Sequence, residues 1–418
     1  MVSTLKANLK TSKNLAWKNF SNLLKRWEKM NVRVQTHNFN GKKLKTARIA
    51  RGVTLEELGK LLNLSHQSVS KYENGKASPD YETLQRISGI LEFTPSFFYS
   101  DNNNNLDPQT SHFFRSGAAV ARKYKDQVKE KVRLLAYVIE FIESRIRLPE
   151  FKYPDFIANH TEFRQLDLSE IDSIAEQLRR YLGLGDGPIS NITALCEKMG
   201  IVISSSKMDN EKIDACTVFY KNRPYILLNN ERLSAVRLRF NIAHELGHIL
   251  LHSRYTEKDI NDKSKHKRIE QEANRFASSL LMPEATLVPE LSSSGLDYLL
   301  LLKEHWKTSI QAIVYRAEEL GIFTSDYALY LRQQISRKKW RQHEPLDDII
   351  PIEKPMLFIQ ALNMIINKYN ITIEEISFQI GLTIEDISLL GELVVEKPLS
   401  KPLDVENHNV VYLHNKNS

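Results

Sequence analysis

The segment Phe240–His252 constrains the fold of this chain more than any other part of the sequence. It contains His244 and His248 four residues apart, with Glu245 beside the first histidine. On a helix, side chains four residues apart lie on one face, so both imidazoles can reach one metal ion and the carboxylate can take a proton from a water held there. The rest of the segment is strongly apolar, and a buried carboxylate between two buried histidines needs a cation. We therefore predict a zinc-binding helix over about residues 234–252, with Zn²⁺ as the cofactor.

A catalytic zinc needs a third protein ligand and an open position for water. His252 lies on the same helix, but the rise from residue 244 is about 12 Å, too far to share the ion. In the helix predicted over residues 269–281, Glu270 shares the face expected to be buried, whereas Glu272 is expected to point away. We favour Glu270, with Glu272 as the alternative, and expect Asn274 to hydrogen-bond the carboxylate or a metal-bound group. The other downstream candidates are Glu257, Asp259 and His266.

The charge of the chain is concentrated at its N-terminal end. The 418 residues carry a net charge of +7, but residues 1–100 hold 17 basic and 7 acidic residues, while the remainder holds 41 and 44. This asymmetry predicts a polyanion partner for the N-terminal end alone.

Composition limits the class of protein. With 42% hydrophobic and 26% charged residues, the chain has the composition of a soluble globular protein. No apolar run is long enough to span a bilayer, and the N-terminus has no signal-peptide core, so we expect no membrane partner. The two cysteines, Cys196 and Cys216, form no paired metal motif, so we expect structural thiols in a reducing cytoplasm.

Residues 40–99 have the pattern of a compact helical domain. Thr54 and Glu57 form a capping box at the start of one helix, and Ser65 caps the next, which is predicted over residues 66–73. A fourth helix is expected after Pro79-Asp80 and a short fifth helix at Thr94-Pro95.

The stretch Thr54–Lys76 resembles the helix-turn-helix of the lambda-repressor-like, or XRE, family. The resemblance implies that the third helix enters the major groove of an operator. Leu55 stands where many relatives carry a glutamine that contacts phosphate, which puts that contact in doubt. The alternative is a helical interaction module that has lost DNA binding, although the local charge argues against it. The residues implied to face base edges are His66, Gln67, Ser70 and Lys71, and those implied to touch phosphate are Ser68 and Lys76.

Two separated motifs resemble the ImmA/IrrE family of zinc metallopeptidases. They are Arg239–His248 and Glu270–Ala277, the second followed by Leu280–Pro283, and the resemblance covers roughly residues 170–340. It implies zinc on His244, His248 and Glu270, with Glu245 as general base and then as acid for the leaving amine. It also implies narrow specificity for regulator or repressor proteins. The family includes fusions with an N-terminal XRE domain.

The sequence predicts a mostly α protein with a small α+β core. We expect a five-helix lambda-repressor-like domain, a zincin-like domain with a short antiparallel sheet, and a helical C-terminal region. One long helix is predicted over residues 118–147, whose apolar stripe serves packing or a homodimer. The expected divisions are 1–38 (basic arm), 39–100 (DNA-binding), 101–166 (linker and long helix), 167–290 (peptidase), 291–345 (helix-turn-helix-like extension) and 346–418 (C-terminal region and tail).

The stretch Thr372–Ser388 repeats the pattern of Thr54–Ser70 at a constant offset. The cap, the Glu-Glu pair and the apolar positions match, but Glu385 and Asp386 replace the polar residues of the first copy. Because two carboxylates repel phosphate, we expect a helix-turn-helix-shaped scaffold without DNA binding.

These features support two functional hypotheses. The first is a bacterial or phage regulator that binds an operator and cleaves a specific protein, either a partner repressor or its own linker at 101–116. The alternative is a DNA-binding repressor or antitoxin whose metal domain is a sensor or scaffold without proteolysis.

Overall fold

The computed structural model describes residues 39–99, 109–114, 122–157, 162–206, 214–229, 233–291, 295–391 and 414–415. The chain divides into two units, residues 1–39 and residues 40–418, and the described elements belong to the second. The basic arm predicted over residues 1–38, and most of the predicted tail, lie outside the described residues. Within the described part, no helix is both long and apolar enough to cross a membrane.

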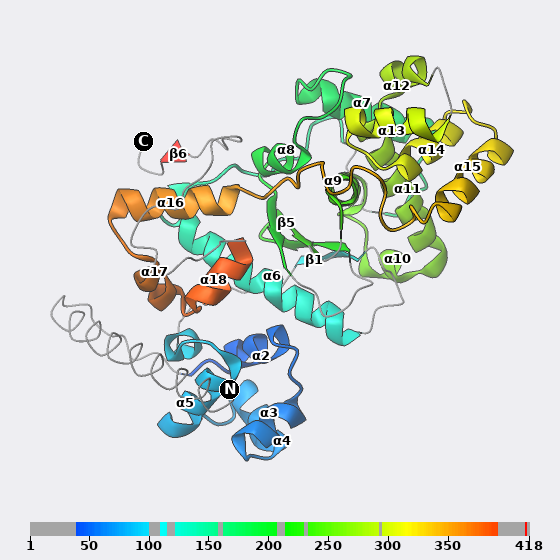
Figure 1. Cartoon of the computed structure of the whole chain (residues 1–418). Coiled ribbons are helices and arrows are strands. Elements are labelled where there is room, and N and C mark those ends of the chain that lie inside the picture. The colour runs from blue at the N-terminus through cyan, green and yellow to red at the C-terminus, as the bar shows by residue number, and fades with distance from the viewer. Residues whose placement is uncertain are drawn as a thin grey trace, which may run out of the picture. The chain divides into compact units, whose positions relative to one another are not determined.

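The first domain consists of four α-helices and a 3-10 helix (Figure 1). The helices are α2 (Gly41–Ala50), α3 (Leu55–Leu62), α4 (His66–Glu73), α5 (Tyr81–Leu91) and η1 (Pro95–Tyr99). Both hydrogen bonds of the predicted capping box at Thr54 are present, and Ser65 caps α4. The predicted fifth helix is a single 3-10 segment, because Pro95 opens it and Phe97 and Phe98 are drawn into the core.

Next along the chain is the long helix α6 (Arg122–Glu143), followed by the short strand β2 (Ile146–Arg147), which pairs with β6 (His414–Asn415). The helix ends four residues before the end of the predicted 118–147 span, and residues 118–121 lie outside the described part of the chain. Its stripe, which includes Val132, Ile139 and Ile142, is buried within this chain. The stripe packs against α2, α16, α17 and the sheet, so it serves packing within the chain. A homodimer stays a prediction, and this stripe does not support it.

The central part of the chain contains a four-stranded sheet in the order β1-β4-β5-β3. The strands are β1 (Gln109–Phe114), β3 (Val202–Ser205), β4 (Ala215–Tyr220) and β5 (Arg223–Leu228). β4 is antiparallel to both neighbours, joined to β5 by a turn in which Lys221 and Asn222 both have positive φ, as the tight hairpin turn requires. The antiparallel pairing predicted for β4 and β5 is confirmed, whereas β3 runs parallel to β5 and makes the sheet as a whole mixed.

The helices of the central domain are α7 (Leu168–Tyr181), α8 (Ile192–Lys198), α9 (Ala235–Gly247), the π-helical turn η3 (His248–His252), α10 (Glu257–Asn261), α11 (Lys263–Leu281) and α12 (Glu284–Glu290) (Figure 1). All but α10 share one continuous core with the sheet, whereas Ile260 of α10 belongs to a smaller cluster with Tyr255 and Ile269. α9 packs against both α11 and β4, so the helix with the histidine motif lies between the third-ligand helix and the sheet.

The C-terminal third is helical. It contains α13 (Leu296–Trp306), α14 (Ile310–Glu319), α15 (Ser325–Arg337), α16 (Leu357–Tyr369), α17 (Ile373–Ile380) and α18 (Ile384–Gly391). The first three share the core of the central domain, and the buried carboxylate of Glu197 accepts the backbone N–H groups that open α16. α17 contacts η1 and α6, and α18 contacts β3, so the last two helices join the first domain to the central one.

Candidate metal centre and nucleic-acid interface

His244, Glu245 and His248 are all fully buried at the end of α9, where the apolar segment is packed on every side. The two imidazoles turn their Nε2 atoms toward each other, 2.9 Å apart. Glu270 from α11 reaches both, with Oε2 3.5 Å from Nε2 of His244 and Oε1 3.3 Å from Nε2 of His248. One donor atom from each of the three residues lies within 4.8 Å of the others, which is a spacing that one ion can bridge.

The residues around the histidines define which ring nitrogen faces this centre. Nδ1 of His244 lies 2.9 Å from Oδ1 of Asn274, and Nδ1 of His248 lies 3.0 Å from Nδ1 of His252. Nε2 of His252 lies 3.1 Å from a carboxylate oxygen of Glu272. Because carboxylate and amide oxygens only accept, every contact is a hydrogen bond only if His244 and His248 each donate from Nδ1. Both Nε2 lone pairs then point at the centre, which is the donor set that zinc prefers.

The carboxylate chemistry of the centre also favours a cation. Burial raises the pKa of Glu270, but the neighbouring imidazoles of His244 and His248 outweigh it and leave that pKa below its usual range. Burial lowers the pKa of His252 to about 4, against the opposing hydrogen bond to Glu272, so this imidazole is neutral at pH 7. The centre combines two imidazoles and one carboxylate, and the residues present fit a divalent ion.

Glu245 is held next to this centre by the sheet. The hydroxyl of Thr217, in the middle of β4, donates to Oε2 of Glu245 at 2.6 Å. Cys216 is its neighbour in the strand; burial, and then the charge of Glu245, raise the pKa of that thiol, so it stays protonated as a structural side chain.

The expectation about the two faces of α11 is wrong. Glu272 was expected to point away from the core, yet it is fully buried, whereas the side chain of Glu270 is 20% exposed. Glu272 also accepts from Leu166 N and pairs with Arg268, which compensates its burial. Glu272 also contacts His252, which the distance from His244 excluded as a ligand of the ion but not as a partner of Glu272. The four-residue spacing from His248 to His252 was the signal that could have found it.

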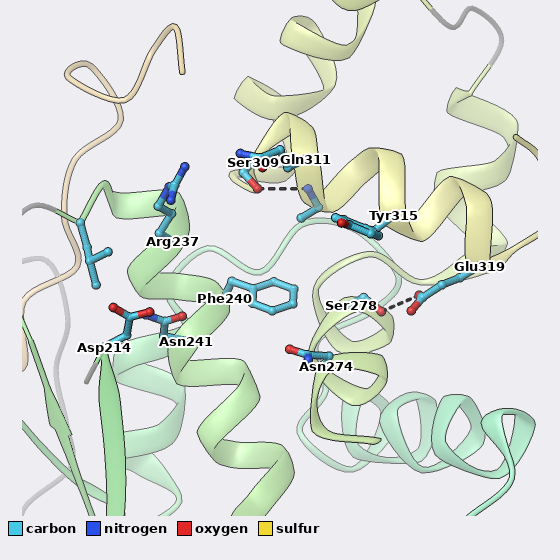
Figure 2. Close-up of a pocket in the computed structure, with 12 residues that line it drawn as sticks. Asp214, Arg237, Phe240, Asn241, Asn274, Ser278, Ser309, Gln311, Tyr315 and Glu319 are labelled. Atoms are coloured by element: carbon cyan, nitrogen blue, oxygen red, sulfur yellow. Dashed lines mark hydrogen bonds between the residues drawn. The ribbon is translucent and has the colours of Figure 1, made fainter. Parts of the chain in front are cut away.

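A pocket of about 380 Å³ lies next to the centre, between α9, α11 and α14 (Figure 2). Asn274 lines it and also contacts His244, so one side chain links pocket and centre. Figure 2 shows Phe240 from α9 and Tyr315 from α14 pointing into the gap, with the Ser278–Glu319 hydrogen bond on its wall. The pocket is of the size that takes one large side chain or a short segment. The pocket could not be predicted from the sequence, because α14 lies more than 60 residues beyond the histidine motif.

The predicted DNA-contacting residues lie on α4 and just after it. His66, Gln67, Lys71 and Lys76 are exposed, while Ser68 and Ser70 are half-buried. Ser68 shares a hydrogen bond with the N-cap Ser65, and the side-chain amide of Asn74 donates to Ser70. Their roles stay predictions.

The opposite side of α4 is fixed to the domain. Arg48 of α2 donates to both carboxylate oxygens of Glu73, at 2.5 and 2.9 Å, in a buried ion pair. Val69 packs into the core. These contacts hold α4 in place in the domain with its other side exposed to solvent.

Comparison with known proteins gives two family matches. Residues 196–318 match the family model described as the IrrE N-terminal-like domain, Peptidase_M78, and residues 44–98 match a model described as helix-turn-helix. The chain carries an XRE-type helix-turn-helix domain and an IrrE-like domain. The IrrE-like match contains α9, α11 and most of α14, so it includes the metal centre and every residue that lines the pocket except Glu319.

Individual relatives match the helix-turn-helix domain. The SPbeta prophage-derived HTH-type transcriptional regulator YonR of Bacillus subtilis (strain 168) is 33% identical over 67 residues, 16% of this chain and 62% of that protein. An HTH-type transcriptional regulator of Sinorhizobium medicae (strain WSM419) is 36% identical over 61 residues, 15% of this chain and 44% of that protein. The chain thus spans about half the length of these relatives.

Among solved structures, Bacillus thuringiensis PlcR in complex with the peptide PapR7 and DNA is similar at 15% identity, over 85% of this chain and 99% of that one. The TM-score of 0.14 is far below the level at which two chains share a fold.

Proposed function

We propose that this protein is a DNA-binding transcriptional regulator with a fused zinc-dependent endopeptidase that cleaves a specific regulator protein, either a partner repressor or itself. The observation that carries the proposal is the convergence of His244, His248 and Glu270 beside Glu245, in a chain that also exposes the second helix of a helix-turn-helix. The match to a peptidase family supports the catalytic reading of this centre.

The centre has the parts that peptide hydrolysis needs. Nε2 of His244, Nε2 of His248 and the Glu270 carboxylate would hold Zn²⁺, which when bound supplies Lewis acidity to water and to the scissile carbonyl. Thr217 holds one oxygen of Glu245, and the other oxygen would accept a proton from the attacking water and pass it to the leaving nitrogen. Asn274 and His252 would keep the two imidazoles oriented.

The surroundings of the centre favour a narrow choice of substrate. The histidines and Glu245 are fully buried, so a substrate reaches them only as an extended segment with a side chain in the adjoining pocket. Phe240 and Tyr315 would contact an apolar or aromatic side chain there, and Asn274 and Gln311 offer amide groups for hydrogen bonds. This arrangement fits a protein cut at one place better than general digestion.

The helix-turn-helix domain would direct the protein to an operator. His66, Gln67 and Lys71 are exposed on one helix that Arg48 and Glu73 hold from behind. Such side chains can read base edges in the major groove, with Ser68 and Lys76 on phosphate.

The experiment compares wild type with Glu245→Gln, a substitution that keeps the shape and removes the base. Each is expressed with the proteins encoded next to it, and mass spectrometry is used to find cuts that require Glu245. Operator fragments, selected from random DNA by the purified protein, are bound by both variants as a control for folding. A cut in wild type that is lost in Glu245→Gln, with DNA affinity unchanged, is the expected result. Equal peptide maps from zinc-loaded wild type and variant would remove the peptidase from the proposal and leave a DNA-binding repressor with a structural metal domain.

A further inference from the structure

The strand β4 lies beside the catalytic carboxylate, because the hydroxyl of Thr217, in the middle of the strand, donates to Glu245 at 2.6 Å. One edge of β4 is fully paired with β5, from Ala215 opposite Leu228 to Tyr220 opposite Arg223. A chain that pairs with the other edge lies one strand away from Thr217 and so runs close to the metal centre.

In this structure that edge is taken by the chain's own strand β1, which comes from the connection between the helix-turn-helix domain and α6 (Figure 1). The pairing is antiparallel, with Phe113 opposite Thr217 and Phe114 opposite Cys216. Because paired strands lie about 5 Å apart, the backbone at Phe113 lies next to the residue that holds Glu245. β1 also contacts α10, which follows the histidine helix directly. Pairing with an exposed edge is a general way for a protein to bind an extended peptide.

The pairing of β1 with β4 is interrupted by a bulge. Gln109 pairs with Phe219 and His112 pairs with Val218, so two residues of β1, Thr110 and Ser111, have no counterpart in β4. Such a bulge leaves peptide groups outside the ladder and bends the strand. By contrast, β4 and β5 pair without interruption.

We propose that Gln109–Phe114 is a substrate strand held in cis, and that the IrrE-like domain hydrolyses its own chain within these residues. This inference rests on the proposed peptidase function and specifies its substrate. In the step, the oxygen of one water bonds to the carbonyl carbon of a residue in the strand while the C–N bond breaks. Glu245 carries one proton of that water to the nitrogen, so the products are a helix-turn-helix fragment with a new carboxylate and a remainder with a new amine.

Holding the strand in cis would account for narrow specificity. The segment is already aligned by its pairing with β4. The conformational entropy that a separate substrate would lose on binding is therefore lost once, when the protein folds. A protein in trans would have to displace β1 before it could pair with β4. The cut would fall between the DNA-binding helices and the rest of the chain.

The test uses the full-length protein loaded with one equivalent of zinc, with Glu245→Gln as the inactive control. Intact-mass analysis should show two fragments from the wild type whose masses add to that of the chain plus one water, with a junction within residues 109–114. Glu245→Gln should stay whole. The fraction cut at a given time should not change on roughly 100-fold dilution, because the reaction is intramolecular.

A matched pair of substitutions tests the strand itself. His112→Pro removes a backbone N–H and disfavours the ladder, and should reduce the cut at least about tenfold. Asn103→Pro, in the same connection but outside β1, should leave it unchanged. Circular dichroism and operator binding verify that both variants fold.

The outcomes separate this inference from the proposed function. A rate that rises with protein concentration would mean that one copy cuts another, and would overturn the cis form. An intact linker together with Glu245-dependent cleavage of a co-expressed regulator would also overturn it, while the proposed function stands. No Glu245-dependent cleavage of either would overturn both.

Discussion

Two segments of this molecule begin with the same helix-capping signals, but their second helices have different surroundings. The reader segment, Thr54–Glu73, contains α3 and α4, and the docked segment, Thr372–Gly391, contains α17 and α18. Each starts with a threonine and a glutamate in a complete capping box, and each first helix has eight residues and ends in the left-handed conformation, at Asn63 and at Gly381. The local signals therefore specify the shape of both segments.

The second helices differ in what they contact. In the reader segment, His66 and Gln67 face solvent. In the docked segment, Asp386 is buried and accepts from both terminal nitrogens of Arg51, at 2.8 and 2.7 Å, and the carbonyl of Leu390 accepts from the hydroxyl of Ser204. The same helix-turn-helix geometry therefore occurs with two different surroundings of the second helix, solvent in the reader segment and protein in the docked segment. We expect the carboxylates of the docked segment to disfavour phosphate.

The largest expected effect concerns the left-handed residue between the two helices. In Gly381→Ala the new methyl group would lie 2.5 Å from Cα of Phe97, at a φ of +84° that alanine adopts poorly. Strain and overlap together should destabilise the docking of α17 by roughly 3 kcal/mol. The matched change Asn63→Gly should alter stability by less than about 0.5 kcal/mol, because Asn63 already has a φ of 55° and glycine adopts this conformation without strain. Hydrogen exchange of the α17 and α3 amides measures both. Equal protection in the two variants would contradict the difference between the segments.

A second pair tests which segment binds DNA. Gln67→Ala should weaken operator affinity by about 1–3 kcal/mol, or roughly 10- to 100-fold, if this side chain contacts a base edge. The corresponding residue of the docked segment is Glu385, which is exposed, and Glu385→Ala should leave the affinity unchanged. Fluorescence anisotropy with a selected operator at fixed salt gives both values. Weaker binding by Glu385→Ala would show that the docked segment also contacts DNA.

The smallest effect tests what the segments share. Thr54→Ala and Thr372→Ala each remove one cap hydrogen bond and disable a capping box, and each should destabilise its own helix by about 1 kcal/mol. Local opening free energies from hydrogen exchange in α3 and α17 are the readout. If the two losses differ by more than about 1 kcal/mol, then tertiary packing, and not the shared local signal, sets the stability of one of these helices.

Much of this architecture could be predicted from the sequence because it rests on local chemistry. The caps at Thr54 and Ser65 and the apolar spacing between them are properties of one short stretch, and α4 has the predicted bounds. The closeness of His244 and His248 follows from helical spacing alone. The acidic character of the second helix in the docked segment was also visible, since Glu385 and Asp386 replace Gln67 and Ser68.

The rest depended on contacts between distant residues. β3, β4 and β5 are buried on both faces, so they lack the alternation that indicates strand direction, and the parallel pairing of β3 could not be foreseen. The burial of Glu272 depends on contacts with the N–H group of Leu166 and with His252, which lie 106 and 20 residues away along the chain. The pairing of β1 with β4 joins segments about 100 residues apart, and no short sequence pattern in either segment predicts it.

The DNA-binding helices are fastened to the rest of the molecule twice. One attachment is covalent, through the connection that contains β1. The other is noncovalent: α2 packs against α6, and Thr94 and Ser96 donate hydrogen bonds to carbonyl groups at Gly381 and Phe378, with the ion pair between Arg51 and Asp386. If the connection is cut as proposed, these contacts still hold the two fragments together, so their separation would obey mass action. Release of the DNA-binding helices would then require two events, one irreversible and one set by concentration, and dilution during growth would act as a delay between them.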